Sequence, residues 1–190
     1  VLKTLENEAV SFEVNPLRIY SQLISEYEVK TGQKSEKKKG VSAEEAAKDP
    51  DVMKIIDERK TALVAACKTI FDTIRKKLSD MPYGLRVICK RIHDITLEKF
   101  PDTNENVVWK VSGYFVFYRF INLMIVQPDN YGVCERDLSI NVRKNLVQIS
   151  KVLQKVFNLG KFPRKNELFV LNEFIEETRE DVLNYNRDLI

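Results

Sequence analysis

The chain has 190 residues, of which 44% are hydrophobic and 31% charged, and its formal net charge at pH 7 is +3. This balance is typical of a soluble globular domain, and so small a positive excess gives no support to nucleic acid as a partner. Six Gly and six Pro residues are too few for an all-β chain with many turns, which favours long helices. The three cysteines show no CxxC spacing, so a reducing intracellular compartment is expected and a disulfide framework or zinc site is not. No metal site and no cofactor are expected.

Helix signals begin at the start of the chain. Residues 1–10 are typical of the end of a helix. Asn15 and Pro16 are an N-cap and a first-turn residue, and the amphipathic helix that they open ends at Gly32. The charged residues 34–40 predict a loop.

A long helix is predicted in the next part of the chain. Ser42 and Glu45 have the spacing of a capping box and predict a short helix before it. Asp49 and Pro50 then start a helix of roughly eight turns. Its apolar residues recur at helical spacing: Val52, Ile55, Ile56, Leu63, Cys67, Ile70, Phe71, Ile74 and Leu78.

The second half of the chain is helical as well. Pro82 and Gly84 interrupt the pattern, and the next helix ends at Pro101. Further helices are predicted over residues 105–125, 140–158 and 165–184. Neither sustained alternation nor a two-residue hairpin signal is present, so the expected fold class is all-α, with about seven helices and no sheet.

The stretch from Val111 to Val126 is apolar on every side of a helix, which indicates burial in a bundle or in a membrane. It is shorter than the roughly 20 residues of a span and contains Arg119, so we expect the central helix of a bundle and no transmembrane segment. Arg119 and Asn122 are expected on one face. Because a buried arginine needs a partner, Arg119 is predicted to be largely buried and bonded to carbonyls or an acid, either as a structural clamp or as the organiser of a binding groove.

Other reactive side chains give little sign of catalysis. His93 is the only histidine, and Asp94 beside it is expected to point elsewhere, so no oriented general base is predicted. Cys67 and Cys89 fall on apolar helix faces and are expected in the core, whereas Cys134 lies in a loop. No phosphate-binding GxxxxGK[ST] loop is present, so the chain is not itself a GTPase.

One motif resembles a known family. The chain reads Phe117-Tyr118-Arg119-Phe120-Ile121-Asn122, followed by Ile125, Val126 and Pro128. This looks like the Phe-Leu-Arg fingerprint of Ras GTPase-activating proteins, Phe-Leu-Arg-Phe-Ile-Asn-Pro-Ala-Ile-Val-Ser-Pro, and Tyr118 is the form seen in the IQGAP branch. The chain departs from the fingerprint where Leu123 and Met124 replace Pro-Ala and Gln127 replaces Ser, which affects the rim of the expected groove.

Further segments that look like the IQGAP branch follow in the right order, so the resemblance covers essentially the whole chain. They are 15–20 with 30–32, 81–86, 98–102, 143–146 and 150–154. The resemblance implies an irregular helical bundle of the Ras GTPase-activating domain type, with residues 1–190 as a single, partial GAP-related domain. The N-terminal helices and the finger loop of the family are expected upstream of residue 1.

The resemblance also assigns roles to individual residues. The fingerprint arginine, here Arg119, steadies the loop that carries the catalytic arginine finger. The lysine that faces the GTPase corresponds to Lys151, and Gln154 lies near it. The expected GTPase-binding groove therefore contains Arg119, Asn122, Lys151, Gln154, Arg86, Arg143 and Arg136. No residue of the chain is expected to be catalytic.

The implied function is a non-catalytic module of an IQGAP-type scaffold that binds a GTP-loaded Rho-family GTPase and acts in actin cytoskeleton organisation and cytokinesis. Full-length relatives also bind actin and calmodulin, and the expected location is the cytoplasm, at the cytoskeleton or cell cortex, including the contractile ring. Two alternatives stay open: an active Ras GTPase-activating domain whose finger lies outside this chain, and a purely structural helical domain.

Overall fold

The computed structural model describes residues 1–5, 10–135 and 137–190. This part of the chain is helical and contains no strand, so the all-α prediction is confirmed. The α-helices are α1 (Leu2–Leu5), α2 (Pro16–Thr31), α3 (Ala43–Ala46), α4 (Pro50–Lys76), α5 (Tyr83–Lys99), α6 (Glu105–Val116), α7 (Asn122–Val126), α8 (Ile140–Phe157), α9 (Asn172–Glu177) and α10 (Arg179–Asp188). The 3-10 helices η1 (Leu78–Asp80) and η3 (Glu167–Leu171) and the π-helical turn η2 (Phe117–Ile121) complete the described elements. Among these described helices, none combines the length and the hydropathy of a membrane-spanning segment.

Local capping explains why the first helices begin and end where the sequence predicts. The side chain of Asn15 accepts hydrogen bonds at the start of α2, and Gly32 ends that helix with a φ of 68°. Ser42 and Glu45 form the predicted capping box of α3. Asp49 caps α4. The predicted helix over residues 1–10 corresponds only to the short α1, and residues 6–9 lie outside the described part.

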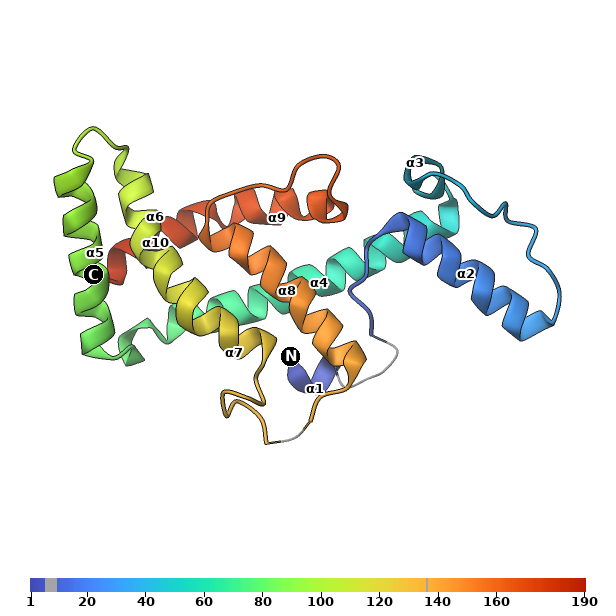
Figure 1. The fold of residues 1–190 in the computed structure, drawn as a ribbon, viewed down its shortest axis with the longest axis horizontal. Helices are drawn as coiled ribbons and strands as arrows, with labels where there is room; N and C mark the ends of the chain where they lie inside the picture. Colours follow the sequence, from blue (N-terminus) through green and yellow to red (C-terminus); the bar gives the residue numbers. More distant parts are fainter. Residues whose placement is uncertain (6–9, 136) are drawn as a thin grey trace.

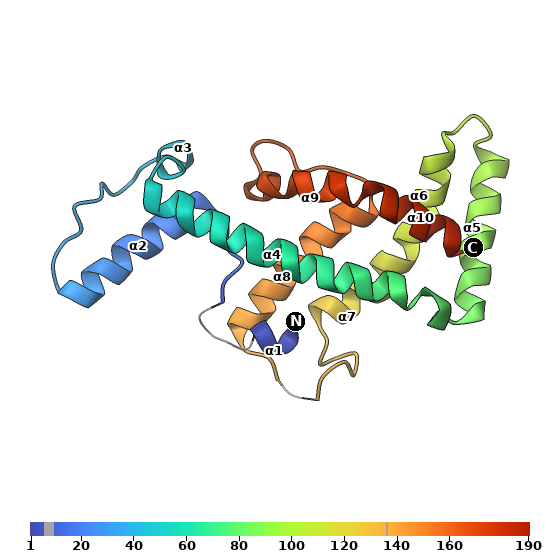
Figure 2. The ribbon, with the colours of Figure 1, turned by 180° about the vertical axis from the view of Figure 1, so that it is seen from behind.

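Helix α4 runs along the long axis of the molecule, and α8 crosses it (Figure 1). At one end, α2, α3 and the start of α4 share a small separate core. Seen from behind in Figure 2, α2 and α3 lie beside the first part of α4 and extend away from the other helices. At the other end lie the α5–α6 hairpin and α10. The separate core consists of Ile19, Tyr20, Ile24, Ala46 and Val52.

Helix α8 is the centre of the main core, since more than half of its 18 residues are buried. Around Phe157, near its end, three aromatic rings converge from three other elements. The ring of Phe117 stacks on it at 4.2 Å, and Phe71 and Tyr185 meet it edge-on, each at 5.6 Å. The prediction that the helix over 105–125 is the central one is therefore wrong.

That predicted helix is also interrupted. The π-helical turn Phe117–Ile121 separates α6 from α7, and its wider turn changes which side chains face the core. Phe117 and Asn122 are buried. The segment packs on α5, α8 and α10, but these helices do not cover all of its sides, and large apolar side chains remain exposed. The exposed ones are Val107, Val111, Tyr118, Phe120, Leu123 and Met124.

The predicted helix over 165–184 is divided in a similar way. The hydroxyl of Thr178 donates to the carbonyl oxygens of Phe174 and Ile175 at 3.0 and 3.2 Å. Bonding of this kind competes with the helical ladder and bends helices. It accompanies the break between α9 and α10.

Candidate functional site

Two adjoining hollows follow one side of α8 and meet at Lys151, and together we call them the α8 groove. The first, the α6 hollow, has a volume of about 260 Å³ and is lined by residues that include Tyr114, Gln154 and Glu167. The second, the α2 hollow, has a volume of about 790 Å³ and is lined in part by Arg18 and Lys144. Lys151 belongs to both linings. The groove is thus built by α8 with α6, α2 and the η3 segment.

Lysines form a row along this side of α8. Lys144, Lys151 and Lys155 are spaced by seven and four residues, which places them on one helix face. Lys144 and Lys151 are exposed, and neither forms an ion pair with a residue of the described part. The ammonium of Lys155 lies 5.6 Å from the centre of the Phe162 ring. The positive charge of the row is therefore not locally neutralised.

A buried hydrogen-bond network fixes the wall of the groove. The Ser150 hydroxyl donates to Asn122 Oδ1 at 2.7 Å, and Gln154 Nε2 donates to Ser150 Oγ at 3.1 Å and to Asn122 Oδ1 at 3.5 Å. Asn122 and Ser150 are buried, whereas Gln154 reaches the α6 hollow. Because paired polar groups in a core are costly to separate, the network holds α7 against α8 and gives Gln154 one orientation.

Stacked side chains continue this wall toward the π-helical turn. The ring of Tyr114, which lines the α6 hollow, stacks on Tyr118 at 5.5 Å, and the Arg119 guanidinium lies 5.6 Å from the centre of the Tyr118 ring. Burial raises the pKa of Tyr114, with a smaller contribution from Tyr118. Its hydroxyl, like that of any tyrosine at neutral pH, is protonated and can donate a hydrogen bond.

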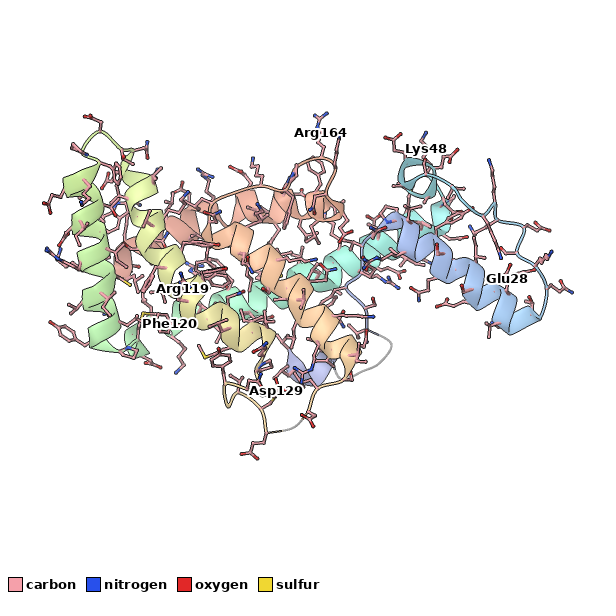
Figure 3. The ribbon with its side chains drawn as sticks, viewed as in Figure 1. Glu28, Lys48, Arg119, Phe120, Asp129 and Arg164 are labelled. Carbon is pink, nitrogen blue, oxygen red and sulfur yellow. The ribbon has the colours of Figure 1, made fainter. Side chains whose placement is uncertain are left out.

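Arg119 itself is exposed (Figure 3). The prediction that it is buried and bonded to carbonyls or an acid is wrong, and so is the prediction that it shares a face with the buried Asn122. The π-helical turn is the physical reason, because the regular periodicity of an α-helix does not hold across it. Arg119 lies next to Tyr118, whose ring stacks on Tyr114 of the α6 hollow, and Arg119 itself belongs to neither groove lining.

The other predicted arginines have separate positions. Arg86 donates to the carbonyl oxygens of Asp188 and Leu189 at 3.0 and 3.1 Å, which places it at the end of α10 and outside the groove linings. Arg143 lines the α2 hollow, where both of its terminal nitrogens bind Asp129 and hold the pKa of that carboxyl below its ordinary value. Arg136 lies outside the described residues.

The structure thus brings together four of the seven residues expected in the groove: Asn122, Arg143, Lys151 and Gln154.

Comparison with known proteins settles the family. A family model described as GTPase-activator protein for Ras-like GTPase matches residues 1–158. The chain belongs to this family. Ras GTPase-activating-like proteins are similar over nearly the whole chain: rgaA of Dictyostelium discoideum is 36% identical over 191 residues, which cover 100% of this chain and 23% of that protein. For gapA of the same organism the identity is 38% over 194 residues, covering 98% and 22% of the two chains.

IQGAP2 of Mus musculus, also named a Ras GTPase-activating-like protein, is 30% identical over 190 residues, or 97% of this chain and 12% of that protein. The resemblance to the GAP-related domain of the IQGAP type is therefore confirmed. The chain spans less than a quarter of the length of each of these relatives.

Several residues that line the groove of this GAP-related domain are not among those predicted from the sequence. Lys144 and Lys155 could have been found, because they repeat Lys151 at helical spacing. Glu13 and Glu167 line the two hollows but come from segments more than 100 residues apart. No pattern in the sequence signals that they meet.

The reactive side chains singled out from the sequence lie outside the groove linings. The ring of His93 packs 4.3 Å from that of Trp109, and its Nδ1 lies 3.2 Å from Asp94 Oδ1, so the prediction that Asp94 points elsewhere is wrong. Contact with Trp109 orients the imidazole and leaves Nδ1 facing its neighbour. Cys67 and Cys89 are buried as predicted, and burial raises the pKa of Cys89 to about 11. The described residues contain no cluster of three or more metal-ligating side chains.

Proposed function

We propose that this GAP-related domain binds a GTP-loaded small GTPase of the Rho family through the α8 groove and does not accelerate GTP hydrolysis. The observation that carries the proposal is the row of Lys144, Lys151 and Lys155 beside the rigid Asn122–Gln154 wall. Membership of a family whose model is described by its action on Ras-like GTPases supports a partner of this class.

The row of lysines suits an acidic protein surface. Exposed ammonium groups without ion pairs form charge-assisted hydrogen bonds with carboxylates and raise the rate of encounter with a negatively charged partner. Lys151 is central, since it belongs to both hollows. Tyr114 and Gln154 add neutral donors beside it, which fix the orientation of the partner.

The absence of catalysis rests on the arginines of the groove. An arginine finger stabilises charge on the transferring phosphoryl group and accelerates hydrolysis by on the order of 10³ to 10⁵. Arg18 is paired with Glu13 at 2.6 Å, and Arg143 is paired with Asp129. Each of these arginines would have to break its ion pair with a carboxylate before it could reach a phosphate. This supports a binding role without an arginine finger.

The proposed setting is an IQGAP-type scaffold that acts in actin cytoskeleton organisation and cytokinesis, in the cytoplasm at the cell cortex. Similarity to IQGAP2 and to the Ras GTPase-activating-like protein rng2 of Schizosaccharomyces pombe supports this setting. Actin and calmodulin are partners expected of the full-length protein, as the resemblance to the IQGAP branch implies.

The test combines binding with single-turnover hydrolysis. GTP-loaded Rho-family and Ras GTPases are each incubated with an excess of the domain, and the first-order rate of hydrolysis is followed with and without it. The proposal predicts binding of at least one Rho-family GTPase and a hydrolysis rate that is unchanged or lower. A 100-fold acceleration would instead support an active GTPase-activating domain, and no binding to any GTPase would support a purely structural domain.

A further inference from the structure

Negative charge is built into the otherwise basic α8 groove. Glu167 lines the α6 hollow together with Lys151 and Lys155, and Glu13 lines the α2 hollow beside Arg18. Glu167 forms no ion pair with a lysine in the part of the chain that the structure describes. The α6 hollow therefore presents positive and negative charges side by side, whereas in the α2 hollow Glu13 forms an ion pair with Arg18 at 2.6 Å.

Asn15 holds both glutamates. Its side-chain amide donates to Glu167 Oε2 at 2.7 Å, and its backbone N–H donates to Glu13 Oε1 at 2.9 Å. Its side-chain oxygen caps α2 by accepting from the backbone N–H groups of residues 17 and 18. Asn15 thus fixes the start of α2 and two carboxylates at the groove. Because Asn15 is itself held by the fold, the carboxylate of Glu167 has a defined position and does not move freely at the surface.

A carboxylate fixed in this way discriminates between partners. A partner acid opposite Glu167 meets like charge, which disfavours binding, whereas a partner lysine or arginine there gains an ion pair. Lys151 and Lys155 in the same hollow have the opposite preference. Together, the two preferences select a partner by the arrangement of its positive and negative side chains and not only by its net charge.

We propose that Glu167 is a specificity-determining residue of the α8 groove. It selects a small GTPase that presents a basic side chain opposite Glu167, flanked by acidic side chains opposite Lys151 and Lys155. This inference rests on the proposed function, because it concerns the choice of partner at the same groove. Asn15 is a positioning residue that acts through Glu167.

Dissociation constants for a panel of GTP-loaded Rho-family and Ras GTPases test the inference. Glu167→Gln removes the charge but keeps an oxygen that accepts from Asn15, and Glu167→Lys reverses the charge. Glu98→Gln and Glu98→Lys are the matched controls, since Glu98 is an exposed residue of α5 outside the groove linings. Melting temperatures of all variants check that they fold.

Glu167→Lys should weaken binding of the GTPase that the wild type prefers by on the order of tenfold. Binding of the GTPases with lower affinity should be unchanged or stronger, so that the ratio of dissociation constants changes. Glu167→Gln should shift the ratio in the same direction by less. Asn15→Ser keeps a capping oxygen and loses the amide donor, so it should reduce selectivity without a large change in melting temperature.

Two results would overturn the inference, and they are distinguishable. If the wild type binds members of the panel but Glu167→Lys changes all dissociation constants by the same factor as Glu98→Lys, Glu167 does not determine specificity while the proposed function stands. If the wild type binds no GTPase, the proposed function fails and the role of Glu167 fails with it.

Discussion

The contact between α6 and α10 depends on the absence of a side chain at Gly113. A Cβ built there would lie 1.7 Å from Oδ1 and 2.4 Å from Cγ of Asn186. Asn186 is fully buried, and neither atom of its side-chain amide has a hydrogen-bond partner among the described residues. The amide therefore cannot swing into water to make room for a methyl group.

The effect of Gly113→Ala follows from two opposing terms. Overpacking of a tight core costs about 1–3 kcal/mol, and the severe overlap with Asn186 places this site at the upper end of that range. Replacing glycine by alanine inside a helix stabilises the folded state by about 1 kcal/mol, which offsets part of this cost. We expect a net loss of roughly 2 kcal/mol, which lowers the melting temperature of a chain of this size by about 4–8 °C.

The assay is thermal and urea unfolding of Gly113→Ala with Gly84→Ala as the control. Gly84 lies in the first turn of α5 with no atom within 4 Å of a Cβ built there, so this substitution should stabilise by about 0.4–1 kcal/mol. In an Asn186→Ala background the overlap is gone, and Gly113→Ala should then be neutral or stabilising. If Gly113→Ala behaved like Gly84→Ala in the wild-type background, the close packing of α6 on α10 would be refuted.

Three further predictions concern single side chains. Arg119→Ala should change the free energy of unfolding by no more than about 0.5 kcal/mol, since Arg119 is exposed; a large drop in urea unfolding would show that it is buried after all. Phe157→Ala should cost about 3–5 kcal/mol in the same assay, because three rings pack on Phe157, and a loss below about 1 kcal/mol would contradict its central place. Arg143 holds the pKa of Asp129 below its ordinary value of 3.8, so this ion pair stabilises the fold above that value and the stabilisation is lost as the pH falls through the lower folded pKa. Asp129→Asn should therefore lower the melting temperature near neutral pH but not at strongly acid pH, and a difference independent of pH would refute the pairing.

Features that depend on neighbours in the chain could be predicted from the sequence. The N-caps at Asn15, Ser42 and Asp49 act on backbone groups two or three residues away, so residue type and spacing were sufficient to locate three helix starts. The termination of α2 at Gly32 belongs to the same class, because it depends on the positive φ of one residue.

The segment around Arg119 could not be predicted in this way. Apolar residues on every side of a helix indicate burial only if neighbouring elements cover every side. Here neighbouring helices leave part of α6 and α7 uncovered, and the π-helical turn changes the direction in which the side chains of residues 117–121 point. Side-chain type therefore gave the wrong environment for Arg119 and for the exposed Tyr118 and Phe120.

The candidate site was predicted in part for a related reason. Lys151 and Gln154 lie on one helix, and the resemblance to the family identified them, while its fingerprint contains Asn122. The contact between Asn15 and Glu167 joins residues 152 positions apart. Contacts of that range depend on how helices pack, which capping and periodicity do not determine.

The measurement that tests the central claim most directly is the association rate of a GTP-loaded Rho-family GTPase with the wild type, Lys151→Glu and a control, at several salt concentrations. Lys54→Glu is the control, since Lys54 is exposed near the start of α4 and outside the groove linings. Binding through the α8 groove predicts that Lys151→Glu slows association by on the order of tenfold at low salt, that the difference narrows as salt rises, and that the control stays close to the wild type. Equal association rates for Lys151→Glu and the wild type at low salt would contradict the account.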